Sequence, residues 1–265
     1  MKSHYIGLWL LISLALSLFM LFAFSDIELG IGEWQMKKAP FREALLAGRP
    51  VSSDSLLVPA DMDDLEADEI LDKPVETDSV PKSILLFGDS MTFNLALRLA
   101  AYAAHNGHQM HAVNWDSSNT KIWADCDTLE HYIKEYNADY VFISLGSNEI
   151  YYKKPEVRLP YVKRILEMID TIPYVWIGPP NWEEDSGIND MLERTCRRGS
   201  FFRSAGMKFE RKKDKIHPTR DASALWMDSI MRWMPHSSHP ILAALPPDTL
   251  GKHPVNVIFL KARHK

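Results

Sequence analysis

Short apolar segments alternate with helix-like segments from residue 82 to residue 235. The apolar segments lack polar alternation, which is typical of strands buried on both faces. Strands alternating with helices predict a parallel sheet covered by helices on both sides. We therefore expect an α/β fold, namely a doubly wound, flavodoxin-like parallel sheet of about five strands flanked by helices. Strands are expected at 84–87, 110–113, 140–145, 174–177 and 207–209, and helices at 92–106, 124–136, 156–169, 188–198 and 220–234.

The N-terminus carries an uninterrupted apolar run from Ile6 to Phe24. As a helix this run would span about 28 Å, close to the thickness of a bilayer core. The basic residue Lys2 precedes it and acidic residues follow it, which would keep its first residues in the cytoplasm. We favour an uncleaved transmembrane anchor over residues 1–25. A cleaved secretory signal is the alternative, and either one places the remaining chain outside the cytoplasmic membrane, in the periplasm or at the cell surface.

The segments on either side of the alternating region differ from it in composition. Residues 26–81 form an acidic juxtamembrane linker, with nine acidic residues between positions 61 and 78. The globular domain is expected at 82–235. A Pro-containing tail follows at 236–265, where the apolar stretch 255–260 would add an edge strand or pack on the sheet.

Composition excludes several function classes. The formal net charge of −5 gives no reason to expect nucleic-acid binding, which asks for a clustered basic surface. Histidines outside the tail lack metal-ligand spacing, so no metal site is expected. Cys126 and Cys196 would be buried free thiols or, alternatively, a disulfide in an oxidising compartment; we favour the thiols.

Polar motifs follow the predicted strands, where function collects in a doubly wound sheet. Gly88-Asp89-Ser90 comes after the first strand, and the helix behind it could direct backbone N–H groups at an oxyanion. Gly146-Ser147-Asn148 comes after the third strand and offers an amide donor. Taken singly, the serine could be an ordinary helix cap and the asparagine a turn residue.

A third motif, Asp214-x-x-His217, follows the last expected strand. An aspartate at this spacing can orient an imidazole that deprotonates a serine, although a lone pair could equally belong to a surface turn. Because each motif follows a separate strand, the three can converge on one edge of the sheet.

Together these blocks resemble the SGNH (GDSL-type) hydrolase superfamily over residues 82–235. Gly88-Asp89-Ser90 is similar to the first block of that family, with Met91 in place of the frequent leucine, and the other two motifs match its Gly-x-Asn and Asp-x-x-His blocks. The resemblance implies Ser90 as nucleophile, His217 as base and Asp214 as its partner. It also implies an oxyanion hole formed by the backbone N–H of Ser90 and the amide of Asn148.

One block departs from the family pattern. A glycine after the second strand usually contributes its backbone N–H to the oxyanion hole, and the aligned position in this chain is Ser118. The N–H is retained in serine, so the resemblance implies Ser118 as a further oxyanion donor, although serine adopts positive φ poorly.

The resemblance implies a serine esterase that forms an acyl-enzyme without a cofactor and acts on acyl groups, O-acetyl above all, of an envelope or extracellular glycan or of a small ester. An O-acyltransferase with the same triad is the alternative. A third is a silent module that binds a glycan or a membrane acyltransferase. Trp115 and Trp182 follow strands and could stack on substrate, although ordinary core packing is as good an interpretation; Glu149 is expected to be a hydrogen-bond partner beside Asn148.

Overall fold

The computed structural model describes residues 30–31, 34–35, 76–247 and 255–261. Two compact units divide the chain, Met1–Glu69 and Ile70–Lys265. In the first, β1 (Gly30–Ile31) pairs antiparallel with β2 (Trp34–Gln35). The expected anchor over 1–25 lies outside the described residues, and within the described ranges no helix has the length and apolar character to cross a membrane.

The second unit is built on a six-stranded parallel sheet, which confirms the α/β architecture. The strand order is β7-β6-β5-β3-β4-β8. Counted from β3, the first five strands follow the 2-1-3-4-5 order of a doubly wound sheet, and β8 is added outside β4. The strands are β3 (Ser83–Gly88), β4 (Gln109–Trp115), β5 (Tyr140–Ser144), β6 (Tyr174–Ile177), β7 (Phe201–Phe202) and β8 (Asn256–Leu260).

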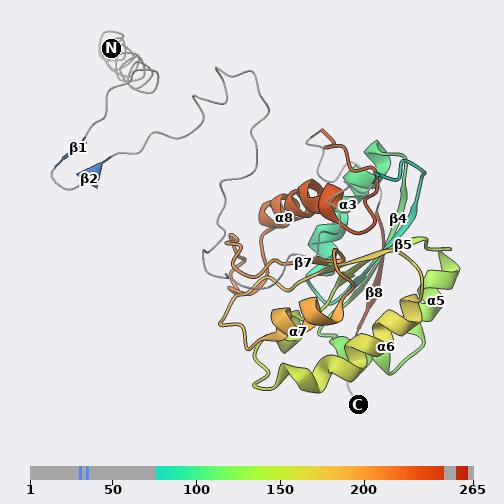
Figure 1. Cartoon of the computed structure of the whole chain (residues 1–265), viewed down its shortest axis with the longest axis horizontal. Coiled ribbons are helices and arrows are strands. Elements are labelled where there is room, and N and C mark those ends of the chain that lie inside the picture. Colours follow the sequence, from blue (N-terminus) through green and yellow to red (C-terminus); the bar gives the residue numbers. More distant parts are fainter. Residues whose placement is uncertain (1–29, 32–33, 36–75, 248–254, 262–265) are drawn as a thin grey trace, which may run out of the picture. The chain divides into compact units, whose positions relative to one another are not determined.

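Helices cover both faces of this sheet, and each face has its own hydrophobic core (Figure 1). Side chains alternate along β3, so that Leu85 and Phe87 join one core while Ile84 and Leu86 join the other. The first core packs under α4 (Thr120–Ala124), α5 (Thr128–Glu135), α6 (Leu159–Ile169) and α7 (Ile188–Thr195). The second packs under α3 (Thr92–His105) and α8 (Arg220–Trp233). Short 3-10 turns complete the set at Ser147–Glu149 (η1), Pro155–Arg158 (η2) and Met234–His236 (η3).

The fifth strand differs from its prediction. The expected strand at 207–209 is wrong, because Gly206 adopts φ 87° and the N–H of Met207 donates to the carbonyl of Ser204 in a turn. The strand that pairs with β6 is β7, at Phe201–Phe202. The Asp214 block therefore stands twelve residues beyond a strand instead of directly after one.

The expected helix at 124–136 is two helices, α4 and α5. The side chain of Asn119 accepts a hydrogen bond from the N–H of Ile122, so the first helix begins earlier than expected. After α8 the chain returns to the sheet: the ring of His108 is 2.8 Å from the carbonyl of Leu242, and the apolar stretch near the C-terminus forms the edge strand β8.

Candidate active site

The site lies where β3 runs between β4 and β5, the point at which the strand order of a doubly wound sheet reverses and ligands bind. Gly88 closes β3 against β5: a Cβ atom there would lie 1.9 Å from the carbonyl oxygen of Ser144. No other residue permits this approach. The N–H of Asp89 then donates to the same carbonyl at 3.0 Å, which fixes the turn that presents Ser90.

The structure brings Ser90, His217 and Asp214 together. The hydroxyl Oγ of Ser90 is 2.8 Å from Nε2 of His217, and Nδ1 of the same ring is 2.8 Å from Oδ2 of Asp214. The serine and the histidine are 127 positions apart in the chain. This is the order of contacts in which a carboxylate orients an imidazole and the imidazole accepts a serine proton.

Residues 211–218 form a hairpin that carries both His217 and Asp214; we call it the cationic hairpin because of its lysines. Arg211 bridges to Pro218, and the N–H of Lys212 donates to the carbonyl of His217 at 2.8 Å. The guanidinium of Arg211 also donates to the carbonyl of Ile216, within the hairpin. The histidine is thus held by its backbone as well as by its ring.

Asp214 is held as an anion. Its Oδ1 accepts the backbone N–H groups of Ile216 and His217, at 2.9 and 3.0 Å. The hydrogen bond from His217, followed by these two, lowers the pKa of Asp214 to about 2. The carboxylate is therefore charged over the whole range in which a histidine can act as a base.

The backbone N–H groups at the start of α3 are nearly all occupied. Those of Met91 and Thr92 donate to Asp89, and that of Phe93 donates to the side chain of Asn114 at 3.2 Å. The N–H of Ser90 has no acceptor in the described part of the chain. One donor at the helix N-terminus is consequently free for an oxyanion beside the Ser90 hydroxyl.

Hydrogen bonds join the loops after β3, β4 and β5. The N–H of Ser147 donates to Oδ2 of Asp89 at 3.2 Å, and Nδ2 of Asn148 donates to the carbonyl of Ser118 at 2.8 Å. An amide nitrogen carries two hydrogens, so Asn148 keeps one N–H after this contact. The bond to Ser118 fixes the direction of the other.

The backbone N–H of Ser118, which was expected to be an oxyanion donor, is used within its own loop. Its own N–H donates to the carbonyl of Trp115 at 3.1 Å, and its Oγ accepts from the indole of Trp123 at 2.9 Å. The positive φ in this loop falls on the preceding residue, Ser117, at 59°. The contact of Ser118 with Asn148 is made by its carbonyl oxygen instead.

Asp89 is a buried carboxylate next to Ser90 in the chain. It is 0% exposed, and its oxygens accept N–H groups from Met91 and Ser147. Burial without a cationic partner raises the pKa of Asp89 to about 7.

Glu149 lies in the turn after β5, where it is a hydrogen-bond partner. It is fully buried, accepts from the hydroxyl of Thr120 at 2.6 Å, and lies 3.0 Å from Nε of Arg158. The distance between Glu149 and Arg158 is that of an ion pair, but the N–H of Arg158 Nε does not point at the carboxylate as it would in a hydrogen bond. Burial raises the pKa of Glu149. This group joins the loop after β5 to the start of α4.

The two tryptophans are partly buried and pack on the cores. Trp115 meets the ring of Trp123 edge-on at 5.4 Å and lines a pocket of about 740 Å³ together with Tyr132. Trp182 packs against both hydrophobic cores. Neither indole contacts the three predicted catalytic residues through a hydrogen bond within the described ranges.

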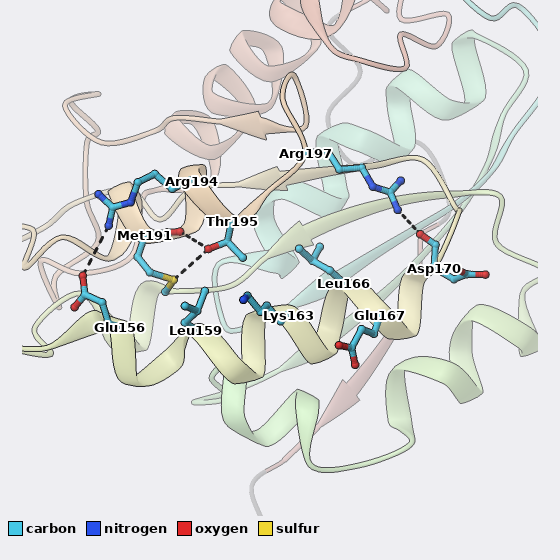
Figure 2. Close-up of a pocket in the computed structure, with 10 residues that line it drawn as sticks. All are labelled: Glu156, Leu159, Lys163, Leu166, Glu167, Asp170, Met191, Arg194, Thr195 and Arg197. Atoms are coloured by element: carbon cyan, nitrogen blue, oxygen red, sulfur yellow. Dashed lines mark hydrogen bonds and ion pairs between the residues drawn. The ribbon is translucent and has the colours of Figure 1, made fainter.

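A separate pocket of about 640 Å³ lies between α6 and α7, with Leu159, Leu166 and Met191 turned into it (Figure 2). An ion pair of 3.8 Å between Arg194 and Glu156 spans one end. None of the predicted catalytic residues lines this pocket. Both cysteines are free thiols, and burial raises the pKa of Cys196 to about 12.

Sequence reasoning gave no role to Asp89, Asn114 or Arg158. Each is a buried polar residue within or next to a loop at the carboxyl end of a strand. Asp89 stands in the Gly88-Asp89-Ser90 block and Asn114 near the end of β4, but the sequence does not separate these residues from exposed neighbours such as Asp116.

No protein-family model matches the sequence, and no curated protein matches it. Among solved structures, one similar chain is a gut microbial diltiazem-metabolizing enzyme, with 11% identity and a TM-score of 0.45. The match covers 60% of this chain and 48% of that chain, so it spans about half the length of the solved protein. This likeness assigns neither a family nor an activity to the chain.

Proposed function

We propose that this protein is a serine esterase of the SGNH type that removes acyl groups, O-acetyl above all, from an envelope or extracellular glycan. The observation that carries the proposal is the relay from Ser90 to His217 to Asp214, with both contacts at 2.8 Å. It is supported by the free N–H at Ser90, because a nucleophile and an oxyanion donor then belong to the same residue.

The chemistry follows from these contacts. His217 takes the proton of Ser90 through Nε2 while Oγ bonds to the ester carbonyl carbon. The oxyanion receives the N–H of Ser90 and the remaining N–H of Asn148. The carbon–oxygen bond to the alcohol then breaks, His217 returns the proton to the leaving alcohol, and an acyl-enzyme remains. Water attacks it by the reverse proton path and releases the acid.

The test is hydrolysis of a short-chain activated ester by the full chain. Wild type should turn the ester over, and Ser90→Ala should retain only background hydrolysis. Ser186→Ala is the matched control, since it removes a hydroxyl outside the relay. Equal turnover by wild type and Ser90→Ala would remove Ser90 from the mechanism.

An O-acyltransferase would use the same acyl-enzyme, with a sugar hydroxyl in place of water. The relay from Ser90 to His217 to Asp214 supports hydrolysis and transfer equally. Incubation with an activated acetyl ester and a candidate glycan separates them. If acetylated glycan accumulates faster than free acetate, the protein is a transferase and the proposed hydrolase activity is wrong.

A silent module that binds a glycan or a partner membrane acyltransferase is the third candidate. The intact relay favours an enzyme over such a module. We further propose that the chain is anchored by residues 1–25 and acts outside the cytoplasmic membrane. Protease added to spheroplasts, in which only the cytoplasmic membrane is a barrier, should then remove an epitope placed at the C-terminus, and protection of that epitope would contradict the placement.

A further inference from the structure

The cationic hairpin concentrates positive charge around the histidine. Between positions 208 and 220 the chain has six lysine or arginine residues and two acidic ones, although the whole protein has a formal net charge of −5. One of the two acids, Asp214, is occupied by His217. The local charge is therefore opposite in sign to that of the molecule.

Five of these cations are exposed and form no ion pair within the described residues, namely Lys208, Lys212, Lys213, Lys215 and Arg220. The nearby loop after β6 carries the exposed acids Glu183 and Glu184, and neither pairs with them. Unpaired cations at the edge of a catalytic centre keep their field for a ligand.

The hairpin holds these cations close to the reacting groups. The backbone of Lys212 is bonded to the carbonyl of His217, and the N–H of Lys215 donates to the carbonyl of Lys212 at 2.9 Å. Arg211 ties the hairpin to the loop after β6 by donating to the carbonyl of Asn181 at 2.7 Å. Arg220, the first residue of α8, stands three positions after His217.

We propose that the cationic hairpin and Arg220 select esters that carry negative charge near the scissile bond. The substrate class is an O-acylated anionic glycan, whose charge comes from uronate carboxylates or from phosphodiesters. This inference rests on the proposed esterase function and specifies its substrate.

The experiment compares acetyl release by the full chain from acetylated polygalacturonate, acetylated polyglycerol phosphate and acetylated neutral xylan. The test variant is Lys212→Gln/Lys213→Gln. The matched control is Lys134→Gln/Lys163→Gln, which removes two exposed, unpaired lysines from α5 and α6 on the opposite face of the sheet.

Wild type should prefer one or both anionic polymers, and the more favoured one identifies carboxylate or phosphate. The test variant should lower the anionic-to-neutral ratio of kcat/KM by about tenfold, mainly through KM, because it removes two charges from the hairpin that carries His217. The control should keep the wild-type ratio. Raising salt from about 10 mM to about 1 M should erase the preference of wild type, since the Debye length falls from about 30 Å to about 3 Å.

Equal kcat/KM on neutral and anionic polymers, unaffected by salt, would overturn the inference while leaving the esterase intact. Absence of activity on every ester, including a small activated one, would overturn the proposed function itself. A third outcome is binding of the full chain to phosphatidylglycerol vesicles that is lost in the test variant while the substrate ratio stays constant. It would replace the glycan by a membrane surface.

Discussion

The side-chain amide of Asn148 donates a 2.8 Å hydrogen bond to the carbonyl oxygen of Ser118. This contact joins the loop after β5 to the loop after β4, and it leaves one N–H of the amide without a partner in this contact. In the oxyanion hole that we propose, the backbone carbonyl of Ser118 would therefore orient the amide of Asn148.

Replacing Asn148 by alanine should reduce kcat by about 10²–10³-fold on a short-chain ester, because one oxyanion donor is lost. KM should change little, since this donor acts on charge that develops in the transition state. Steady-state kinetics measure both. A fall of less than about tenfold would exclude Asn148 as an oxyanion donor.

Asp214→Asn should reduce kcat by up to roughly 10⁴-fold while the fold is retained, because the amide favours the wrong tautomer of His217. The matched control is Asp221→Asn, which removes an exposed negative charge in the first turn of α8. Similar losses in the two variants would indicate a general charge effect in place of orientation of the imidazole.

Folding stability should depend on the pH through Asp89. Its pKa is about 7 in the fold, against 3.8 for the ordinary side chain, so the folded state binds the proton more tightly. The stabilisation is complete below about pH 4 and is lost as the pH rises through about 7. The melting temperature of wild type should fall by several degrees from pH 5 to pH 8.

The comparison variant for this effect is Asp89→Asn, in which the side chain at position 89 no longer titrates. Its melting temperature should fall less over the same interval. The buried Glu149 shifts in the same direction and is present in both proteins, so the difference isolates Asp89. Parallel pH curves for the two proteins would contradict the assignment.

Glu149→Gln should lower the free energy of unfolding by about 3–5 kcal/mol, because it leaves the guanidinium of Arg158 buried without its counter-ion. Glu156→Gln is the control: its exposed ion pair with Arg194 at 3.8 Å should contribute about 1 kcal/mol or less. Urea unfolding at pH 8 measures both. Equal effects would show that burial of the Glu149 pair is energetically unimportant.

The buried strands could be predicted from the sequence because these segments are apolar without alternating polar residues. Leu85, Phe142 and Trp176 lie in such strands and are fully buried. The strand at Phe201–Phe202 has only two residues, which is too short to give a recognisable pattern. Met207 and Phe209 alternate like strand residues, but they lie in a loop and pack against the core from there. Local hydrophobicity does not reveal whether a partner strand lies within reach.

The sequence indicated which residues form the candidate site, but it did not indicate most of the hydrogen bonds between them. Ser90 and Asn148 lie in motifs that directly follow strands, whereas His217 lies in a motif whose expected strand is absent, and the structure brings Ser90 and His217 into contact. The altered part played by Ser118 depends on φ at the neighbouring Ser117, which the residue type alone does not determine. The burial and hydrogen bonds of Asp89 and Glu149 arise from contacts between loops that lie far apart in the chain, so the local sequence does not reveal them.

The role of Ser90 as nucleophile is tested by intact-protein and peptide mass spectrometry after reaction with a fluorophosphonate serine probe. One adduct is expected on the peptide that contains Ser90. The adduct should be absent in Ser90→Ala and strongly slowed in His217→Ala. A wild-type protein that remains unlabelled while hydrolysing esters, or a label that persists in Ser90→Ala, would contradict the assignment of Ser90 as the nucleophile.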